Sequence, residues 1–145
     1  MGYTTEFTGS FETDKPVDNE TFDLINGLAG TRRVKRSGLD AKYGIDGEFY
    51  WETDGNYGQN ESPSTQPGPW LQWEMTDRQT IEWDGGEKFY YYVEWLEYLI
   101  DKILKPKGYI INGEVEWAGE EQGDLGLIIV VNNVVTIKKG YIEYK

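Results

Sequence analysis

Hydrophobic and polar residues alternate along several short segments of the chain. Near the N-terminus, Tyr3, Phe7 and Phe11 alternate with polar residues, and Gly9 is expected to form a bulge. A period of two is typical of a strand with one buried face. The same pattern predicts strands over residues 48–52, 70–75, 81–83 and 109–117. Runs of β-forming residues predict further strands over 127–131 and 134–137 and a terminal strand over 141–144. Asn132-Asn133 predicts a two-residue hairpin turn, because Asn tolerates positive φ angles.

A helical period replaces this alternation in two segments. The first helix is expected to begin after Asp18, whose side chain can cap the first turn, with Val17 packing on Phe22. Its apolar face is formed by Phe22, Ile25, Leu28 and Ala29. Because Gly27 and Gly30 disfavour a helix, its stability must come from packing.

The second helix has the strongest periodic signal. Asp84 and Glu87 stand three residues apart, as in a capping box, and predict where the helix begins. Apolar residues then recur at spacings of three and four: Phe89, Tyr92, Val93, Leu96, Leu99, Ile100 and Ile103. Pro106 and Gly108 predict its end.

The predicted elements follow the order β-α-β-β-α-β, with further antiparallel strands at the C-terminus. This order predicts an α+β fold in which two helices pack on one face of a mainly antiparallel sheet, similar to a ferredoxin-like core with C-terminal hairpin strands. The 145 residues can form one hydrophobic core, and the sequence has no internal repeat or interdomain linker. We therefore expect a single domain over residues 1–145.

The composition excludes several kinds of catalytic site. The chain has no His and no Cys, which removes Ser-His-Asp and Cys-His nucleophilic sites, thiol chemistry and the usual zinc, haem and iron–sulfur ligands. We therefore expect a protein that is not an enzyme and that needs no metal or cofactor. The opening sequence MGYTTEFTGSFE has no apolar run, so we expect a cytoplasmic protein with no membrane partner.

The chain is strongly acidic. It has 14 Lys and Arg residues against 26 Asp and Glu residues, a formal charge of −12. Such a charge repels polyanions over roughly one Debye length, about 8 Å at physiological salt. Direct nucleic-acid binding is therefore not expected, whereas a basic partner would be attracted.

One local concentration of positive charge stands out against this background. Four basic residues lie within five positions near the expected end of the first helix: Arg32, Arg33, Lys35 and Arg36. Guanidinium groups form forked hydrogen bonds with phosphate or carboxylate, so the cluster is a candidate site for an anionic ligand. The simpler interpretation, favoured by the small energies of surface ion pairs, is that these cations complement the helix dipole and pair with surface carboxylates.

Several aromatic residues fall out of phase with the buried stripes. Trp51, Trp73 and Trp83 are expected in the core. The candidates for stacking on a ligand are Tyr57, Trp70, Tyr90 and Tyr91. An oligomer interface explains such residues equally well, because Tyr and Trp are enriched there too.

Carboxylates occupy the polar positions of several predicted strands, including Glu48, Glu52, Glu74, Glu82, Glu114 and Glu116. Their simplest role is to form the solvated face of a sheet. Two of them could act as acid and base in glycoside hydrolysis, given the correct separation and one raised pKa. Alternatively, the whole face could mimic the phosphates of DNA in the cleft of a nucleic-acid-binding enzyme.

Six stretches of the sequence are distinctive: GYTTEFTGSFETDKP, TRRVKR, GEFYWE, PSTQPGPWLQW, IEWDGGEKFYYYVEWLEYLI and GYIINGEVEWAGEE. Together they resemble an uncharacterised family of small proteins from phages, prophages and bacterial genomes. The resemblance covers most of the chain and implies a phage or mobile-element origin, where small proteins often antagonise host defence. It supplies no activity, and the segment 37–47 is shorter here than in the family.

Three functional hypotheses follow. The first is a non-enzymatic, phage-borne protein that captures a small anionic ligand, such as a nucleotide signal, between the basic cluster and the exposed aromatic residues. The second is an acidic protein–protein inhibitor or DNA mimic that acts on a basic host nuclease or defence protein. The third, a carboxylate-dependent hydrolase, has the least support. The protein would act in the cytoplasm of the bacterial host, and exposed aromatic residues and an exposed edge strand favour a homo-oligomer.

Overall fold

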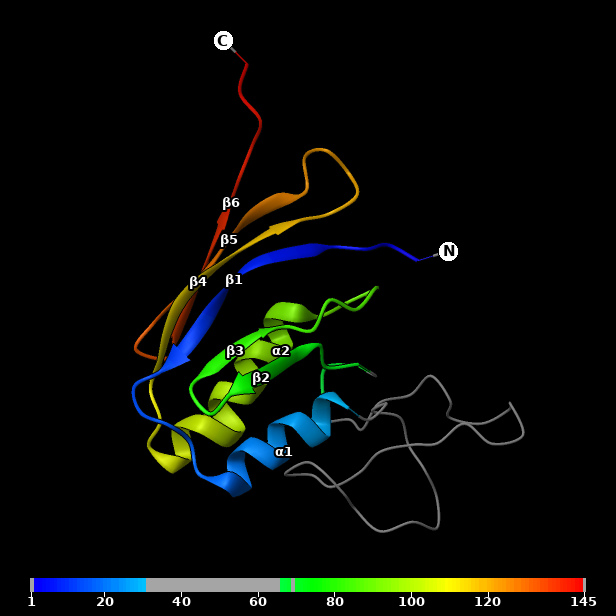
Figure 1. Cartoon of the computed structure of the whole chain (residues 1–145). Coiled ribbons are helices and arrows are strands. Elements are labelled where there is room, and N and C mark those ends of the chain that lie inside the picture. The colour runs from blue at the N-terminus through cyan, green and yellow to red at the C-terminus, as the bar shows by residue number, and fades with distance from the viewer. Residues whose placement is uncertain (1, 31–65, 69, 145) are drawn as a thin grey trace, which may run out of the picture.

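The computed structural model of the chain describes residues 2–30, 66–68 and 70–144. Their fold is α+β, as the sequence predicts, with two helices packed on a six-stranded antiparallel sheet (Figure 1). The strands are β1 (Glu6–Thr13), β2 (Trp73–Asp77), β3 (Thr80–Trp83), β4 (Ile111–Ala118), β5 (Leu125–Val131) and β6 (Val134–Lys139). The helices are α1 (Asn19–Ala29) and α2 (Tyr92–Tyr98), and α2 continues as a π-helical segment (Leu99–Leu104) and a 3-10 turn (Lys105–Lys107).

The order of strands in the sheet is β2-β3-β1-β4-β5-β6, and every neighbouring pair is antiparallel. The first strand is therefore central, between β3 and β4. The strand predicted over 48–52 lies outside the described residues, as does most of the connection from α1 to β2. For that reason the ferredoxin-like detail and the single domain over 1–145 stay predictions.

The predicted bulge at Gly9 is wrong. Strand β1 pairs with β4 without interruption, from Glu6 opposite Ala118 to Thr13 opposite Ile111. Gly9 has a φ of +116°, and a Cβ atom there would lie 2.5 Å from the backbone oxygen of Glu114. Glycine is required because β4 approaches the β1 backbone too closely for a side chain.

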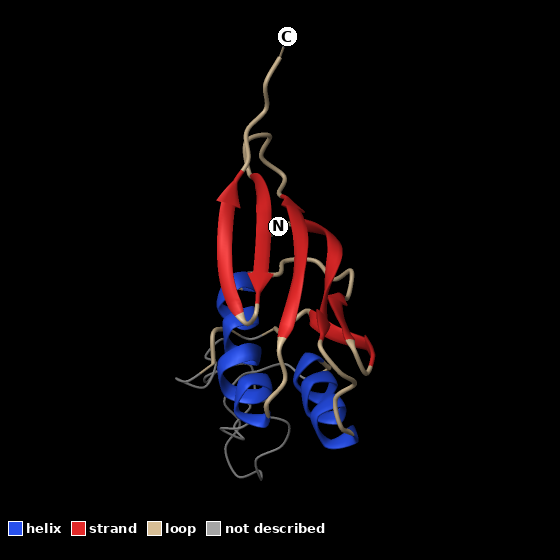
Figure 2. Ribbon diagram, turned by 90° about the vertical axis from the view of Figure 1, so that its left-hand side faces the viewer, coloured by secondary structure: helices blue, strands red, loops and turns tan. Residues whose placement is uncertain are grey.

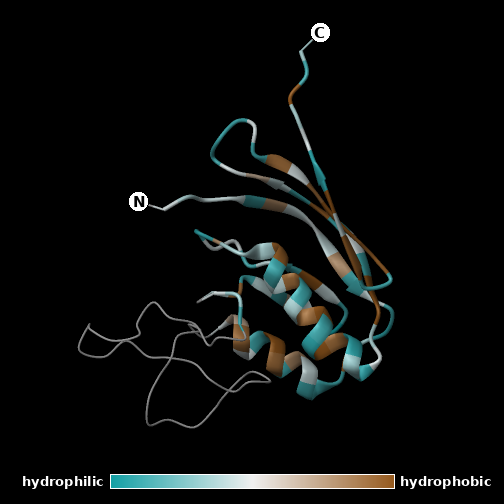
Figure 3. Cartoon of the chain, turned by 180° about the vertical axis from the view of Figure 1, so that it is seen from behind, coloured by the Kyte–Doolittle hydropathy of each residue, from teal (hydrophilic) through white to brown (hydrophobic). Residues whose placement is uncertain are grey.

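One hydrophobic core lies between the sheet and the helices. Trp73 is fully buried, and its ring centroid lies 5.2, 5.5 and 5.3 Å from those of Phe7, Phe11 and Phe89. These edge-to-face contacts join β1 and β2 to the segment before α2. Figure 3 shows hydrophobic and hydrophilic bands alternating along the helices, the pattern expected of helices with one buried face.

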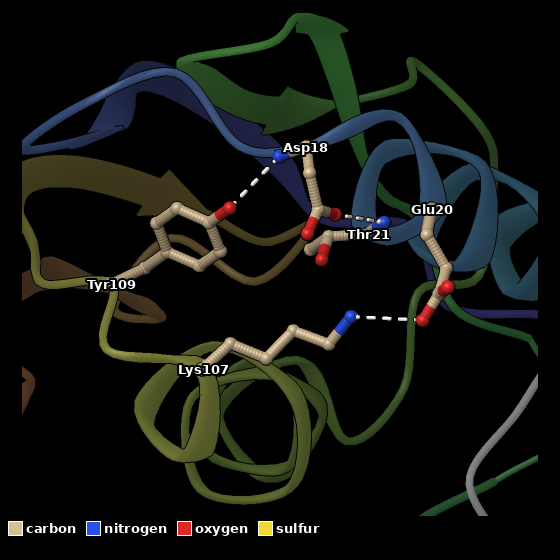
Figure 4. Close-up of polar contacts among 5 residues, drawn as sticks. All are labelled: Asp18, Glu20, Thr21, Lys107 and Tyr109. Atoms are coloured by element: carbon tan, nitrogen blue, oxygen red, sulfur yellow. Dashed lines mark hydrogen bonds and ion pairs between the residues drawn. The ribbon is translucent and has the colours of Figure 1, made fainter.

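The start of α1 is held by side chains from two directions (Figure 4). The Asp18 carboxylate accepts a hydrogen bond from the Thr21 amide at 2.7 Å, which confirms the predicted N-cap. Hydrogen bonding with Thr21 holds the pKa of Asp18 below its usual value. The Asp18 amide donates to the Tyr109 hydroxyl at 2.8 Å. Lys107 pairs with Glu20 at 3.1 Å. The segment before β4 therefore fixes the position of α1.

The predicted capping box at Asp84 and Glu87 is wrong, because α2 begins only at Tyr92. The Asp84 carboxylate instead accepts from the Gly86 amide at 2.8 Å, which closes a local turn. Lys88 and Tyr91 have φ angles of 63° and 60°, which a continuous helix does not allow. The buried position of Phe89 thus belongs to an irregular segment rather than to the first turn of the helix.

The rest of the second helical pattern agrees with the prediction. Leu96, Ile100 and Ile103 are buried, and Gly108 ends the segment with a φ of +85°. Trp95 is also fully buried, although the predicted stripe did not include it.

The predicted hairpin turn at Asn132-Asn133 is confirmed, with φ angles of 49° and 70°. The terminal strand predicted over 141–144 is wrong, because those residues are not in a strand. Gly140 makes the last ladder bond, to the backbone oxygen of Leu125 at 2.8 Å, and Leu125 is the first residue of β5. The tail therefore runs past the end of its neighbouring strand and projects from the sheet (Figure 2).

Within the described ranges, no helix combines the length and apolar character needed to cross a bilayer.

Candidate functional site

The sequence-predicted site residues divide into two groups. The basic cluster Arg32, Arg33, Lys35 and Arg36, together with Tyr57, lies outside the described residues. The other three, Trp70, Tyr90 and Tyr91, are exposed by 44%, 46% and 54%. The structure therefore agrees with the expectation that these three rings are not core residues.

Contacts with other segments hold Tyr90 and Tyr91. Tyr91 lies against Gly68, where a Cβ atom would come within 2.9 Å of the tyrosine ring. The Tyr90 hydroxyl accepts a hydrogen bond from the Tyr3 amide at 3.0 Å. Trp70 is only two residues from Gly68, so all three rings belong to one region beside the start of α2.

The Gln72 side chain holds the segment between β3 and α2. The Gln72 side chain donates to the Glu87 backbone oxygen at 2.7 Å and accepts from the Trp83 indole at 3.2 Å. A left-handed backbone at a bulky residue such as Tyr91 is a genuine outlier, and strain of this kind is often found at functional sites. Tyr90 and Tyr91 therefore lie on a segment that is held by side-chain hydrogen bonds.

The sheet face opposite the helices is a second candidate surface, which we call the outer face. Alternation along the strands places six carboxylates there: Glu6 and Glu12 of β1, Glu74 of β2, Glu82 of β3, and Glu114 and Glu116 of β4. The ion pairs Lys107–Glu20 and Lys139–Asp124 of the described residues involve none of them. The acidic face expected from the sequence is therefore present in the described strands, whereas Glu48 and Glu52 lie outside them.

The outer face is hydrophobic toward β6. In one cross-strand row, Ser10 lies opposite Glu114, which lies opposite Ile129. At the far end of the same face, Val131 and Val134 are exposed by 55% and 64%. An acidic half thus lies beside a mainly aliphatic half on β5 and β6, in which Thr136 and Lys138 are polar.

Glu74 and Glu82 are directly opposite each other on β2 and β3. Partial burial raises the pKa of Glu74, and the negative charges of Asp84 and Glu82 raise it further. Like charges in directly opposite positions destabilise an antiparallel pair. The ionised Glu74–Glu82 pair therefore lowers the stability of the fold.

Replacing Glu74→Gln is expected to stabilise the fold at neutral pH by about 0.2–1 kcal/mol, the range for cross-strand pairs. A carboxylate whose pKa is raised by folding contributes stability at low pH and loses it as the pH rises through the folded-state pKa. The gain should therefore vanish below the ordinary pKa of Glu, 4.5. Urea denaturation of the variant and the wild-type protein at several pH values measures this difference in the free energy of unfolding. Glu114→Gln, which faces Ser10 and Ile129, is the control and should give no comparable gain.

A groove of about 1030 Å³ opens where the start of α1 meets the β2–β3 turn. Glu12, Asp23 and Asp77 contribute carboxylates to its lining. The single guanidinium in the lining, Arg78, donates to the Asn19 side chain at 3.0 Å. Glu12 belongs to both the groove and the outer face, whereas Phe22 and Asp23 belong to α1, which packs on the other face of the sheet. The groove therefore meets the outer face at its edge. The groove could not be predicted from the sequence, because its residues come from segments far apart in the chain.

Asp124 is another residue whose position could not be read from the sequence. Its carboxylate accepts hydrogen bonds from the Tyr3 hydroxyl at 2.7 Å and the Trp117 indole at 2.9 Å, and both lower its pKa. The Thr4 amide donates to the Glu120 carboxylate nearby. These bonds anchor the N-terminal segment to the β4–β5 loop, which indicates a structural role.

Comparisons with known proteins find no match to a family model, a curated protein or a solved structure. The resemblance to a phage and prophage family therefore stays a prediction. In the part of the chain that the structure describes, no three His, Cys, Asp or Glu residues are grouped in a way that could hold a metal ion.

Proposed function

We propose that the protein is a non-enzymatic binding protein that docks a basic protein partner on its outer face. It would act as an acidic inhibitor or DNA mimic against a basic host nuclease or defence protein. The observation that supports this most strongly is the set of six carboxylates on four adjacent strands, on the sheet face opposite the helices.

The arrangement of these charges suits a basic protein surface. Glu114 and Glu116 are two residues apart on one strand, so their side chains leave the same face about 7 Å apart. Regularly spaced anionic groups are what a nucleic-acid-binding surface recognises in a phosphate backbone. The chain as a whole carries a charge of −12, which would speed its encounter with a basic partner.

The aliphatic half of the outer face supports a protein partner over a small cation. Interfaces between proteins combine an apolar core with a polar rim. Ile129, Val131 and Val134 could form such a core beside the carboxylates. The groove at Glu12 would accept a protruding Lys or Arg side chain at the edge of the same interface.

Capture on the immobilised protein tests the proposal. From a bacterial lysate at low salt, the protein should retain a basic protein that elutes as the salt concentration rises, because screening weakens contacts between charges. A capture that recovers no basic protein under these conditions would contradict the proposal.

A second candidate is the capture of a small anionic ligand such as a nucleotide. The observation in its favour is the exposure of Trp70, Tyr90 and Tyr91, which offer rings for stacking on a base. A nucleotide released in stoichiometric amount when the purified protein is denatured would support this candidate. Replacing Arg32 and Arg33 with alanine should then abolish nucleotide binding without unfolding the protein.

A further inference from the structure

The two edges of the sheet differ in how their backbone is satisfied. At the β2 edge, the Asn26 side chain of α1 donates to the Met75 backbone oxygen at 3.0 Å and accepts from the Met75 amide at 2.8 Å. One amide side chain thus replaces the bonds that a neighbouring strand would make. Helix α1 therefore blocks this edge against pairing with another chain.

The β6 edge has no such cover. The two-residue turn makes Val131 and Val134 a hydrogen-bonded pair. Hydrogen bonds in an antiparallel ladder involve every second residue, so Val134, Thr136 and Lys138 make the bonds of β6 to β5. The amides and carbonyls of Val135, Ile137 and Lys139 consequently point away from β5. Among the described residues, no hydrogen bond to these backbone groups is found.

Large apolar side chains follow this open edge. Val134 and Ile137 are exposed by 64% and 43%. Beyond the strand, Tyr141 and Tyr144 are exposed by 79% and 80%, on a tail that projects from the sheet (Figure 1). An open edge strand with exposed aliphatic and aromatic residues is a typical surface for strand pairing between chains.

We propose that a second copy of this chain pairs with it antiparallel through β6, around a two-fold axis at Ile137. Ile137 would then lie opposite the partner subunit's Ile137, and Val135 opposite the partner subunit's Lys139. The two sheets would form one continuous twelve-stranded sheet. This inference is independent of the proposed function, although both copies would present the outer face on the same side.

Repulsion between lysines favours the register with its axis at Ile137 over the next two registers. Shifting the axis to Lys138 or Lys139 would place identical lysines directly opposite each other, which is unfavourable. An axis at Ile137 avoids that contact and pairs the whole of Val134–Lys139. In this register the tail of each copy also runs past the β5–β6 turn of the other, where Tyr141 would be covered.

The net charge of −12 does not prevent the association. Strand β4 is the acidic strand nearest the edge, and β5 and β6 separate it from the partner. In the paired sheet the two β4 strands would lie five strand spacings apart, roughly 24 Å. This is about three Debye lengths at physiological salt, so the acidic halves of the two copies repel each other only weakly.

Sedimentation equilibrium of the full chain tests the proposal. The wild-type protein should have twice the mass of one chain and dissociate on dilution, whereas Ile137→Lys should be monomeric because it places two like charges at the axis. Val131→Lys makes the same kind of change on an exposed residue one strand away from the edge and should stay dimeric. A wild-type protein that is monomeric at every concentration would overturn the proposal.

Single-cysteine variants test the register separately. Because the chain has no Cys, Ile137→Cys creates the only thiol, and two copies paired at this residue would have Cα atoms about 5.5 Å apart, within reach of a disulfide. Mild oxidation should cross-link Ile137→Cys and leave Val131→Cys largely monomeric on a denaturing gel. A dimer that survives Ile137→Lys, or that cross-links through Val131→Cys instead, would show that β6 is not the interface.

Discussion

Replacing Trp73→Ala is expected to lower the free energy of unfolding by about 3–5 kcal/mol, the usual cost of removing a fully buried Trp. The indole packs edge-to-face on Phe7, Phe11 and Phe89, and its N–H donates to the Tyr92 backbone oxygen at 2.8 Å. The variant loses these contacts and leaves a cavity. Urea denaturation followed by circular dichroism measures the change, which is a large part of the roughly 5–15 kcal/mol of a typical domain.

Trp70→Ala is the matched control for this prediction. Trp70 is three residues away and is exposed by 44%, so its removal should change the free energy of unfolding by less than about 0.5 kcal/mol. If the two variants were equally stable, the aromatic cluster around Trp73 would not be the centre of the core.

Replacing Glu114→Lys and Glu116→Lys together is expected to weaken binding of the captured basic protein by roughly 100-fold or more. Losing one partner of a charge pair that the interface buries costs about 2–5 kcal/mol, and about 1.4 kcal/mol corresponds to tenfold in affinity. Both side chains are exposed, so the fold should be unaffected. Calorimetric titration against the captured protein measures the effect.

A second double variant controls for the effect of net charge alone. It replaces two carboxylates on the opposite side of the molecule with Lys. Glu94 and Glu97 are exposed on α2, which packs on the other face of the sheet. Replacing both with Lys changes the formal charge from −12 to −8, as the Glu114 and Glu116 changes do, because each replacement adds two units. Equal loss of affinity in the two double variants would show that binding responds to total charge and not to the outer face.

Periodicity predicted most of the described fold because the core is built from regular elements. The alternation of Phe7 and Phe11, the Asp18 cap and the Asn132-Asn133 turn each depend on neighbouring residues, so the local sequence contains the information. Where a local signal competes with tertiary packing, the prediction was wrong. The Asp84 cap is an example, because Gln72 and the buried Phe89 hold that segment in a non-helical path.

The terminal strand was wrongly predicted for a different reason. Residues 141–144 have a pattern typical of a strand, but a strand also needs a partner, and β5 begins at Leu125. Which strands are neighbours, and where each begins, is a property of the whole sheet. The same reason explains why the open β6 edge and the blocked β2 edge could not be distinguished from the sequence.

The candidate site was predicted in part. The exposure of Trp70, Tyr90 and Tyr91 agrees with the prediction, although all three precede the elements whose periodicity predicted it, since β2 begins at Trp73 and α2 at Tyr92. The acidic outer face follows from the alternation of carboxylates along the strands. The groove that meets its edge at Glu12 could not be predicted, because α1 and the β2–β3 turn meet there only in the folded chain.

Carboxylate labelling of the complex tests the central claim most directly. A carbodiimide reagent would be applied to the protein alone and to its complex with the captured basic protein, and mass spectrometry would measure the modification of each residue. We predict that Glu114 and Glu116 are protected in the complex while Glu94 and Glu97 are labelled as before. Protection of Glu94 and Glu97, with Glu114 and Glu116 labelled equally in both samples, would contradict binding through the outer face.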